Sequence, residues 1–239
     1  MEQESIRINK FLSEAGICSR RGADRMVEDG RVTINGTGAQ LGDRIQPGQK
    51  VCVDGKPVSR EDERILLAYH KPKGIVCTSA KKEKNNIIDY LNYPKRIYPI
   101  GRLDKDSEGL LLLTNDGELA NEIMKARNYH EKEYEVTVSR PVTETFLRGM
   151  AGGVPILDTM TRKCQVEQTG KRSFRIVLTQ GLNRQIRRMC EYFGYRVTKL
   201  VRVRIMNIYL GDLPVGKYRE LTEKEWAELS AALKKDEEK

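Results

Sequence analysis

Near the start of the chain, apolar residues recur every three to four positions, which is the period of an amphipathic helix. The pattern predicts one helix over residues 6–16, ended by a glycine, and a second over residues 19–30. Ser19 is suited to cap the second helix, because its hydroxyl can accept a hydrogen bond from the first turn. The apolar positions of this helix pair are Ile8, Phe11, Leu12, Ala15, Ala23, Met26 and Val27.

Two hairpin signals follow these helices. Asn35-Gly36 and Asp54-Gly55 each separate short apolar runs, and such dipeptides adopt the left-handed backbone of tight hairpin turns. The polar residues 58–64 then form the expected linker. We therefore expect a small N-terminal domain over residues 1–60 and a second domain over residues 64–239.

From residue 64 onward the pattern changes to strands with helices between them. Strands are predicted over residues 133–139, 174–180 and 201–211, and helices over residues 117–126, 143–152, 183–194 and 223–233. The helices are too few and too irregularly placed for repeated βαβ units. The fold class expected here is α+β, with a mixed or antiparallel sheet.

Four consecutive leucines closed by an Asn-Asp-Gly turn predict a buried strand in the middle of the chain. Asp104 stands in the loop just before this strand, where it can aim a carboxylate into a cleft. It can equally pair with Arg102 or Lys105 at a surface turn. Asp106 and Glu108 add two carboxylates, to which we assign turn-forming and solvated roles. The residues alone do not rank the three acids.

The net charge of +9 favours a polyanionic partner, and nucleic acid before membrane, because excess lysine and arginine can neutralise phosphates. The charge is unevenly placed. Residues 171–204 hold ten Lys/Arg and one acid, a difference of +9 that equals the charge of the whole chain. Such a cluster is either a solvated face or a binding surface, and we favour a binding surface.

Other features narrow the class of protein. The apolar runs are short and the chain opens with no hydrophobic leader, so we expect a cytoplasmic protein without a membrane span. The five cysteines form no C-x-x-C pair and only two histidines accompany them, so we interpret them as reduced packing residues and expect no metal site. No phosphate-binding loop or dinucleotide fingerprint is present, and we expect no cofactor.

Residues 7–37, "RINKFLSEAGICSRRGADRMVEDGRVTINGT", resemble the S4 RNA-binding domain. The resemblance implies that the helix pair and the following loop grip structured RNA through phosphate contacts. The residues to which this role is carried over are Arg7, Lys10, Arg20, Arg21 and Arg25. The alternative is a small packing module with ordinary surface arginines.

Residues 101–117, "GRLDKDSEGLLLLTNDG", resemble the central motif of the RNA pseudouridine synthases of the RsuA/RluB/RluE/RluF group. Residues 70–74 ("HKPKG"), 130–136 ("HEKEYEV") and 180–189 ("QGLNRQIRRM") follow the order of that group, and the later segments are most similar to the RluF type. The resemblance implies isomerisation of uridine to pseudouridine in ribosomal RNA, with the 23S large-subunit RNA as the expected substrate.

The reaction breaks the bond from N1 of uracil to C1′ of the sugar and joins C5 to C1′, so it needs no oxidant and no activation by phosphate. It needs an ionised carboxylate near C1′ and C2′. The resemblance implies that Asp104 supplies it and that Arg187 orients it through a two-pronged guanidinium contact. It also implies that Tyr134 stacks on the flipped-out uracil, with its hydroxyl near C5. Without the resemblance, Tyr134 on its alternating strand is half-buried core.

Phosphate contacts in the second domain are expected from Lys71, Lys73, Arg102, Arg184 and Arg188. For the two lysines a turn beside a strand is an equal alternative. The expected partner is structured ribosomal RNA with a bulged or looped target uridine, since a base inside a duplex hides its glycosidic bond. No membrane and no small-molecule partner is expected.

Two other classes of protein fit part of the pattern. A non-catalytic RNA-binding protein explains the charge and the S4-like segment, and leaves Asp104, Tyr134 and Arg187 unexplained. A glycoside hydrolase or nucleosidase using Asp104 with Asp106 or Glu108 would also act at an anomeric carbon. Release of free uracil would distinguish it from an isomerase, which keeps the base.

Overall fold

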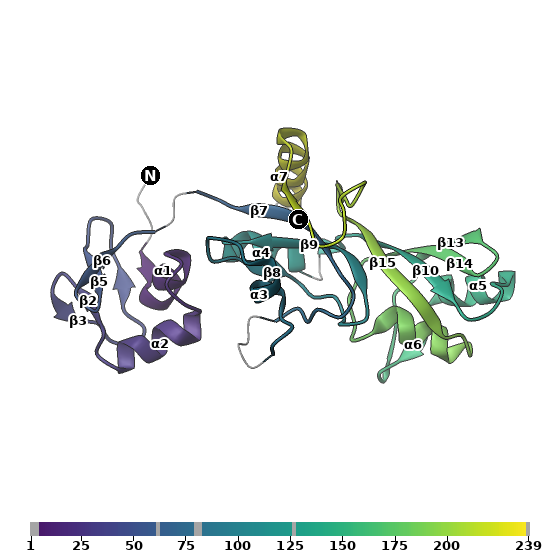
Figure 1. Ribbon diagram of the computed structural model, residues 1–239, viewed down its shortest axis with the longest axis horizontal. Coiled ribbons are helices and arrows are strands. Elements are labelled where there is room, and N and C mark those ends of the chain that lie inside the picture. Colours follow the sequence, from purple (N-terminus) through teal and green to yellow (C-terminus); the bar gives the residue numbers. More distant parts are fainter. Residues whose placement is uncertain (1–4, 61–62, 79–82, 126–127, 238–239) are drawn as a thin grey trace. The chain divides into compact units, whose positions relative to one another are not determined.

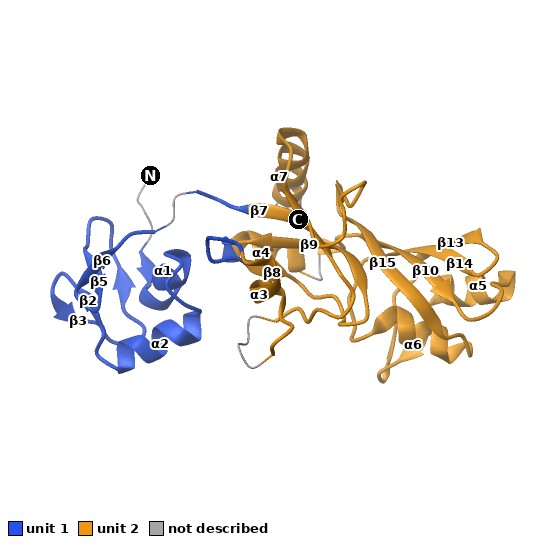
Figure 2. Ribbon diagram, in the orientation of Figure 1, with its two compact units in different colours: residues 1–65, 93–97, 115–117 blue, residues 66–92, 98–114, 118–239 orange. Residues whose placement is uncertain are grey.

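The computed structural model describes residues 5–60, 63–78, 83–125 and 128–237, with side chains to residue 235. The chain forms two compact units (Figure 2). Unit 1 comprises residues 1–65, 93–97 and 115–117, and unit 2 comprises residues 66–92, 98–114 and 118–239.

Unit 1 consists of a helix pair and two small sheets. Strands β2, β3, β5 and β6 form one sheet in the order β3-β2-β5-β6, and β1 pairs with β4. The elements are β1 (Ile6–Arg7), α1 (Ile8–Glu14), α2 (Arg20–Glu28), β2 (Val32–Ile34), β3 (Thr37–Gly38), β4 (Arg44–Ile45), β5 (Val51–Val53) and β6 (Lys56–Val58).

Local signals in the sequence account for the elements of unit 1. The hydroxyl of Ser19 accepts a hydrogen bond from the backbone N–H of Gly22 at 3.1 Å, which confirms the predicted cap of α2. Asn35 and Asp54 have positive φ, as the two predicted hairpin turns require. The predicted apolar positions Ile8, Phe11, Leu12, Ala23 and Val27 lie in the core of the unit.

Unit 1 includes two segments that the sequence pattern placed in the second domain, residues 93–97 and 115–117. Within the unit, Nη1 of Arg96 donates to Oγ of Ser13 at 3.3 Å. Of the predicted linker, residues 61–62 lie outside the described residues. The division into residues 1–60 and 64–239 is kept as our proposal for the two functional domains.

Among the described residues, nine strands of unit 2 form one sheet (Figure 1). Its main path is β13-β14-β10-β15-β9-β7-β17, with β16 paired to β15 and β8 to β9. Strands β15 and β9 are parallel, and the other neighbours are antiparallel. The predicted α+β class with a mixed sheet is therefore confirmed.

The elements of unit 2 are β7 (Leu66–Lys71), α3 (Ile87–Leu91), β8 (Tyr98–Ile100), β9 (Glu108–Thr114), α4 (Gly117–Met124), β10 (Lys132–Val138), α5 (Glu144–Gly152), β11 (Pro155–Ile156), β12 (Thr159–Met160), β13 (Gln165–Gly170), β14 (Ser173–Leu178), α6 (Gln185–Tyr192), β15 (Val197–Ile205), β16 (Ile208–Tyr209), β17 (Tyr218–Glu220) and α7 (Glu223–Glu237).

The four leucines form the centre of β9 and are fully buried, as predicted. Strand β9 lies between β7 and β15. Gly109 at its start has a φ of +114°, and a Cβ there would lie 2.3 Å from the carbonyl oxygen of Arg202. Only glycine therefore allows the backbone of β15 to approach at this point.

Helices cover both faces of the sheet in unit 2. Helices α5 and α6 pack on an apolar cluster with β10 and β14, whereas α4 and α7 pack on a second cluster with β7 and β9. Leu200 of β15 belongs to the first cluster and Val201 to the second. Because consecutive strand residues point to opposite faces, the two helix pairs lie on opposite sides of the sheet.

Two sequence predictions differ from the structure in detail. The single strand expected over residues 201–211 is a hairpin, because Met206 has a φ of +51° and β16 folds back on β15. The short helix α3 and strands β8, β11, β12, β13 and β17 were not predicted, since most are too short to show a period. The predicted helix 117–126 ends at Met124 as α4, and residue 126 lies outside the described residues.

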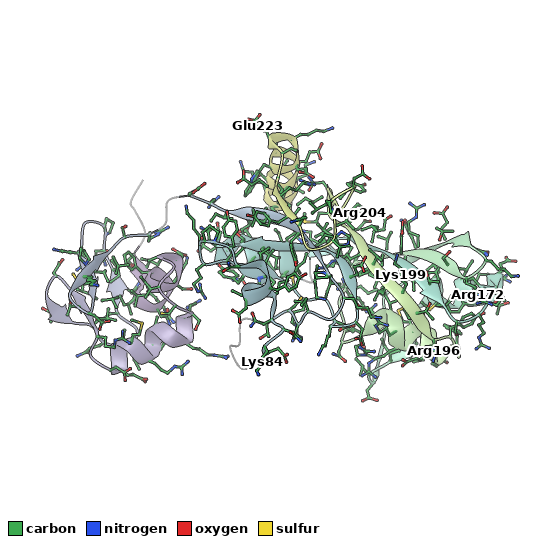
Figure 3. All side chains as sticks on the ribbon, in the orientation of Figure 1. Lys84, Arg172, Arg196, Lys199, Arg204 and Glu223 are labelled. Carbon is green, nitrogen blue, oxygen red and sulfur yellow. The ribbon has the colours of Figure 1, made fainter. Side chains whose placement is uncertain are left out.

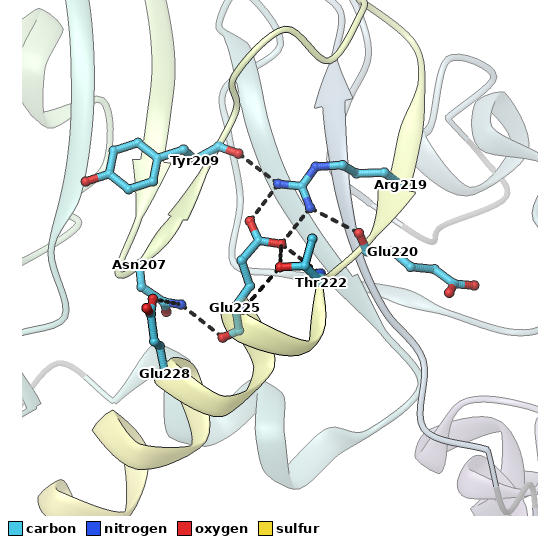
Figure 4. Close-up of polar contacts among 7 residues, drawn as sticks. All are labelled: Asn207, Tyr209, Arg219, Glu220, Thr222, Glu225 and Glu228. Carbon is cyan, nitrogen blue, oxygen red and sulfur yellow. Dashed lines mark hydrogen bonds and ion pairs between the residues drawn. The ribbon is translucent and has the colours of Figure 1, made fainter.

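A polar network holds the start of α7 (Figure 4). Thr222 and Glu225 cap the helix reciprocally: the backbone N–H of each donates to the side chain of the other. The guanidinium of Arg219 donates two hydrogen bonds of 2.7 Å to the Glu225 carboxylate. The hydrogen bonds from Arg219 are the main cause that holds the pKa of Glu225 below its usual value, and the hydrogen bond from the Thr222 backbone adds to the effect.

None of the helices in the described part of the chain combines the length and apolar character needed to cross a bilayer.

Candidate functional site

The loop that carries Asp104 is fixed by contacts along its length. The backbone N–H of Ser107 donates to the carbonyl of Asp104 at 3.0 Å and closes a turn. The backbone N–H of Gly74 donates to the carbonyl of Lys105 at 2.7 Å. Asp104 therefore lies in a hydrogen-bonded loop directly before β9, as the sequence pattern predicted.

Two arginines at the start of α6 face the Asp104 carboxylate. Its Oδ2 lies 3.8 Å from Nε of Arg187 and 3.9 Å from Nη1 of Arg184. The side chain of Asp104 is 31% exposed, whereas that of Arg187 is only 11% exposed. Asp104 is therefore a half-buried carboxylate with two positively charged groups beside it.

The contact between Arg187 and Asp104 differs from the predicted two-pronged pairing. Nη2 of Arg187 donates to the carbonyl of Asp106 and to Oγ of Ser107, each at 3.1 Å. Nε, the atom nearest Asp104, is buried and makes no hydrogen bond with any described residue. Arg187 therefore holds the loop backbone with one side of its guanidinium and approaches the carboxylate with another.

The structure separates the three acids that the sequence did not rank. The side chain of Asp106 is exposed, and only its backbone carbonyl contacts Arg187. The Glu108 carboxylate lies 3.4 Å from Nε2 of His70. Of the three, Asp104 alone lies between the two arginines.

Lys71 is a correction to the expected phosphate contacts. Its side chain is fully buried, so it offers no surface to RNA. Its ammonium group donates to the carbonyls of Pro72 and Ser107, each at 2.9 Å, and burial lowers its pKa. Lys71 thus anchors the Asp104 loop, whereas Lys73 in the same turn is exposed.

Tyr134 lies near this loop across the sheet. It pairs with Arg202 of β15, which in turn pairs with Gly109 of β9. With strands about 4.8 Å apart, the backbones of Tyr134 and Gly109 are roughly 10 Å apart. The Tyr134 ring packs against the cluster that contains α6, so it shares one side of the sheet with Arg187.

The basic segment 171–204 includes arginines that are buried or paired within the protein. Arg204 is bound to Glu131 and Glu133, at 3.0 and 2.8 Å, and Arg202 is buried. Figure 3 shows Arg204 near one end of β15 and Arg196 beyond the other. Arg202 and Arg204 therefore do not belong to the expected binding surface, and the binding role of the other basic residues in the segment stays a prediction.

The other expected RNA contacts lie at accessible positions. Arg7, Arg20, Arg21 and Arg25 of unit 1 and Arg102 and Arg184 of unit 2 are exposed, and Lys10 and Arg188 are half-buried. Nζ of Lys10 lies 3.7 Å from Oε1 of Glu14, and Nε of Arg188 donates to the carbonyl of Asn183. These positions are accessible to phosphate groups of RNA.

Sequence reasoning missed Ser107 and Arg202. Ser107 is buried and links both anchors of the loop, since its hydroxyl accepts from Arg187 and its carbonyl accepts from Lys71. Arg202 donates from Nε to the carbonyl of Leu110 at 2.7 Å. Ser107 belongs to the quoted motif, but no pattern in the sequence indicates these particular partners.

A strained aromatic residue, Tyr129, lies before β10. Its φ is +54°, its side chain is 58% exposed, and the guanidinium of Arg162 lies 4.0 Å from the ring centroid. A left-handed backbone costs about 1–2 kcal/mol, whereas a surface cation–π contact contributes about 0.5–1 kcal/mol. The stack alone does not offset the strain.

Among the residues that the structure describes, no three His, Cys, Asp or Glu side chains form a group that could hold a metal ion.

Residues 65–192 match the family of RNA pseudouridylate synthases, and residues 6–51 match the S4 domain. The chain is 56% identical over 227 residues to the dual-specificity RNA pseudouridine synthase RluF of Salmonella typhi, covering 94% of this chain and 78% of that protein. It is 38% identical over 243 residues to the ribosomal large subunit pseudouridine synthase B of Salmonella typhimurium, covering 95% and 80%.

The fold of the chain also has a solved counterpart. The crystal structure of a pseudouridylate synthase superposes with a TM-score of 0.69 at 28% identity, covering 94% of this chain and all of the other. Fold, motifs and overall identity therefore agree. The chain belongs to the RNA pseudouridylate synthase family and is an RNA pseudouridine synthase with an N-terminal S4 domain.

Proposed function

We propose that the chain isomerises one uridine to pseudouridine in the 23S RNA of the large ribosomal subunit, with Asp104 as the catalytic carboxylate. The observation that carries this proposal is the Asp104 side chain held between Arg184 and Arg187 on a fixed loop. Support for the RNA class comes from the similarity to a ribosomal large subunit synthase.

Asp104 acts at the sugar of the target nucleotide. It either attacks C1′ as the bond to N1 breaks, or removes the proton from C2′ as the base leaves. Both routes need an ionised carboxylate at neutral pH. The guanidinium groups of Arg184 and Arg187 place two positive charges beside this carboxylate.

Arg187 positions the loop that carries Asp104, in addition to supplying positive charge beside its carboxylate. Its bonds to the Asp106 carbonyl and the Ser107 hydroxyl place the carboxylate relative to α6. A lysine has no planar fork and would not make these contacts together with the approach to Asp104. Arg184, with its exposed side chain, is better placed to contact an RNA phosphate next to the target uridine.

Tyr134 stacks on the uracil and takes part in the loss of the proton from C5. Its ring packs on one side against the α6 cluster, and its hydroxyl makes no hydrogen bond with any described residue. A half-buried hydroxyl without a protein partner is free to bind the substrate. Stacking offsets part of the few kcal/mol that unstacking the uridine costs.

The RNA itself must present a uridine that can leave its stack, as in a bulge or loop. The exposed arginines of unit 1 supply sequence-independent phosphate contacts that hold a neighbouring helix. A ribosomal RNA substrate also implies that the enzyme acts in the cytoplasm. The name of the RluF relative includes dual specificity, so more than one RNA substrate must be sought for this chain.

The test is to map pseudouridines by carbodiimide-dependent reverse-transcription stops in ribosomal and transfer RNA from cells with and without the gene. We expect one stop in 23S RNA to disappear on deletion and to return with the wild-type gene but not with Asp104→Asn. A lost stop in 16S or transfer RNA alone would contradict the proposed RNA class.

A further inference from the structure

Tyr129 and Arg162 form a stacked pair that has no part in the chemistry proposed above. Tyr129 comes five residues before Tyr134, just ahead of β10, and Arg162 lies ahead of β13. Even with the guanidinium of Arg162 over its ring at 4.0 Å, Tyr129 is 58% exposed. The structure thus presents a flat aromatic surface backed by a cation.

This pair is joined to the segment that leads into α6. Nη1 of Arg162 donates to the carbonyl of Thr179, and its backbone N–H donates to Oε1 of Gln180, each at 3.1 Å. Gln180 opens the stretch that continues to Arg184, whose guanidinium lies beside Asp104. The Tyr129–Arg162 pair therefore lies at the end of the sheet where that segment begins.

The strands confirm this placement. Lys132, the first residue of β10, pairs with Leu178, the last residue of β14. Tyr129 therefore precedes β10 at the same sheet end where Thr179 and Gln180 leave β14. Lys163, next to Arg162, is exposed and adds a second positive charge there.

We infer that the Tyr129–Arg162 pair binds an unpaired nucleobase of the RNA substrate, next to the flipped-out uridine. Every base has a flat face, and single-stranded RNA is held by stacking on aromatic side chains beside positive charge. Arg162 holds the ring in place and attracts the backbone phosphates. The inference rests on the proposed RNA substrate, but not on which RNA class contains it.

The role also explains why a tyrosine occupies a left-handed backbone position. Asparagine and glycine are the residues that such a position favours. Strained residues gather at ligand sites. A bulky aromatic residue in a left-handed position is therefore explained if its exposed ring binds a ligand. A nucleobase stacked on the open face is such a ligand.

The first experiment measures turnover with the full chain and total RNA from cells lacking the gene, labelled with 5-tritiated uridine. Total RNA contains the substrate whichever class it belongs to. We expect Tyr129→Asn, which suits the backbone, to raise the KM for RNA roughly tenfold with kcat little changed. Tyr129→Phe keeps the ring and should keep the wild-type KM.

Tyr209→Ala is the matched control. Tyr209 is also exposed, at 57%, and the guanidinium carbon of Arg204 lies 5.8 Å from the centroid of its ring. Its removal should leave the KM unchanged. An unchanged KM in Tyr129→Asn, with normal tritium release by the wild type, would overturn the inference and leave the proposed function intact.

The second experiment detects the contact directly. Asp104→Asn protein, bound to the same RNA, is irradiated at 254 nm, and cross-linked peptides are identified by mass spectrometry. We expect a nucleotide attached to Tyr129, absent when Tyr129→Asn is added and retained with Tyr209→Ala. Cross-links at other sites of the protein but none at Tyr129 would overturn the inference, even if the wild type released no tritium.

Discussion

Lys71 and Lys73 stand in one turn but have opposite environments. Lys71 is buried against the carbonyls of Pro72 and Ser107, whereas Lys73 is exposed. We expect Lys71→Met to lower kcat roughly tenfold, since the loop of Asp104 loses an anchor, with little change in the KM for RNA. Lys73→Met is the control and should affect the KM alone. Steady-state tritium release separates the two, and equal effects of both variants would contradict a positioning role for Lys71.

Tyr134→Phe keeps the aromatic ring and removes the hydroxyl. RNA should bind with unchanged affinity, and product formation should fall by roughly 10²-fold or more, because the group next to C5 is lost. Filter binding and tritium release measure the two effects. Wild-type turnover by Tyr134→Phe would restrict Tyr134 to stacking, and wild-type turnover by Tyr134→Ala would remove it from the site.

At the scale of elements, the cap of α7 gives a test of pH dependence. Arg219 holds the pKa of Glu225 below its ordinary value of about 4.3. A carboxyl whose pKa is depressed on folding stabilises the protein above that ordinary value, and this stability is lost as the pH falls through the folded pKa. We expect Arg219→Met to lower the free energy of unfolding at pH 7 by about 1–2 kcal/mol.

The difference in stability between Arg219→Met and the wild type should shrink as the pH falls below the ordinary pKa of a glutamate and through the lowered pKa of folded Glu225, because the carboxyl then takes up a proton. Urea unfolding at pH 7 and at pH 3.5 measures this difference in the free energy of unfolding. Lys224→Met, which breaks an exposed pair with Glu228, is the control and should change stability by less than about 0.5 kcal/mol. A pH-independent cost of Arg219→Met would show that the network acts through packing instead of charge.

The elements that the sequence predicted are those with strong local signals. Ser19 as a cap, the turns at Asn35 and Asp54, and the buried leucines of β9 follow from backbone and solvation rules that operate over a few residues. The hairpin at Met206 was missed because both of its strands share one apolar run. Its turn depends on the backbone conformation of Met206, for which the sequence carries no signal.

The residues of the candidate site also divide into those that local sequence signals predicted and those that they did not. The position of Asp104 ahead of a buried strand is local and was predicted. The burial of Lys71 and the pairing of Arg204 with glutamates depend on neighbours distant in sequence, so neither followed from the segment around Lys71 or from the count of charges over residues 171–204. Resemblance to a family indicated Arg187 correctly as a neighbour of Asp104, but not the backbone and hydroxyl contacts by which it holds the loop.

At the scale of the whole molecule, unit 1 should set affinity for RNA and unit 2 the chemistry. We expect the full chain with Arg20→Gln, Arg21→Gln and Arg25→Gln to bind RNA more weakly and with a salt dependence reduced by about two to three charges. The unfolding midpoint and kcat should not change. Lys234→Gln with Lys235→Gln, at exposed positions near the end of α7, is the control. An unchanged salt dependence of the triple variant would contradict RNA docking by unit 1.

The central claim, that Asp104 performs the chemistry, is tested most directly by tritium release from RNA carrying 5-tritiated uridine, which reports substitution at C5. Asp104→Asn keeps the size of the side chain and removes its charge, so release should fall to background while RNA binding survives. Asp106→Asn and Glu108→Gln should retain measurable release, and all variants should unfold at similar denaturant concentrations. Substantial tritium release by folded Asp104→Asn protein would contradict the assignment of the chemistry to Asp104.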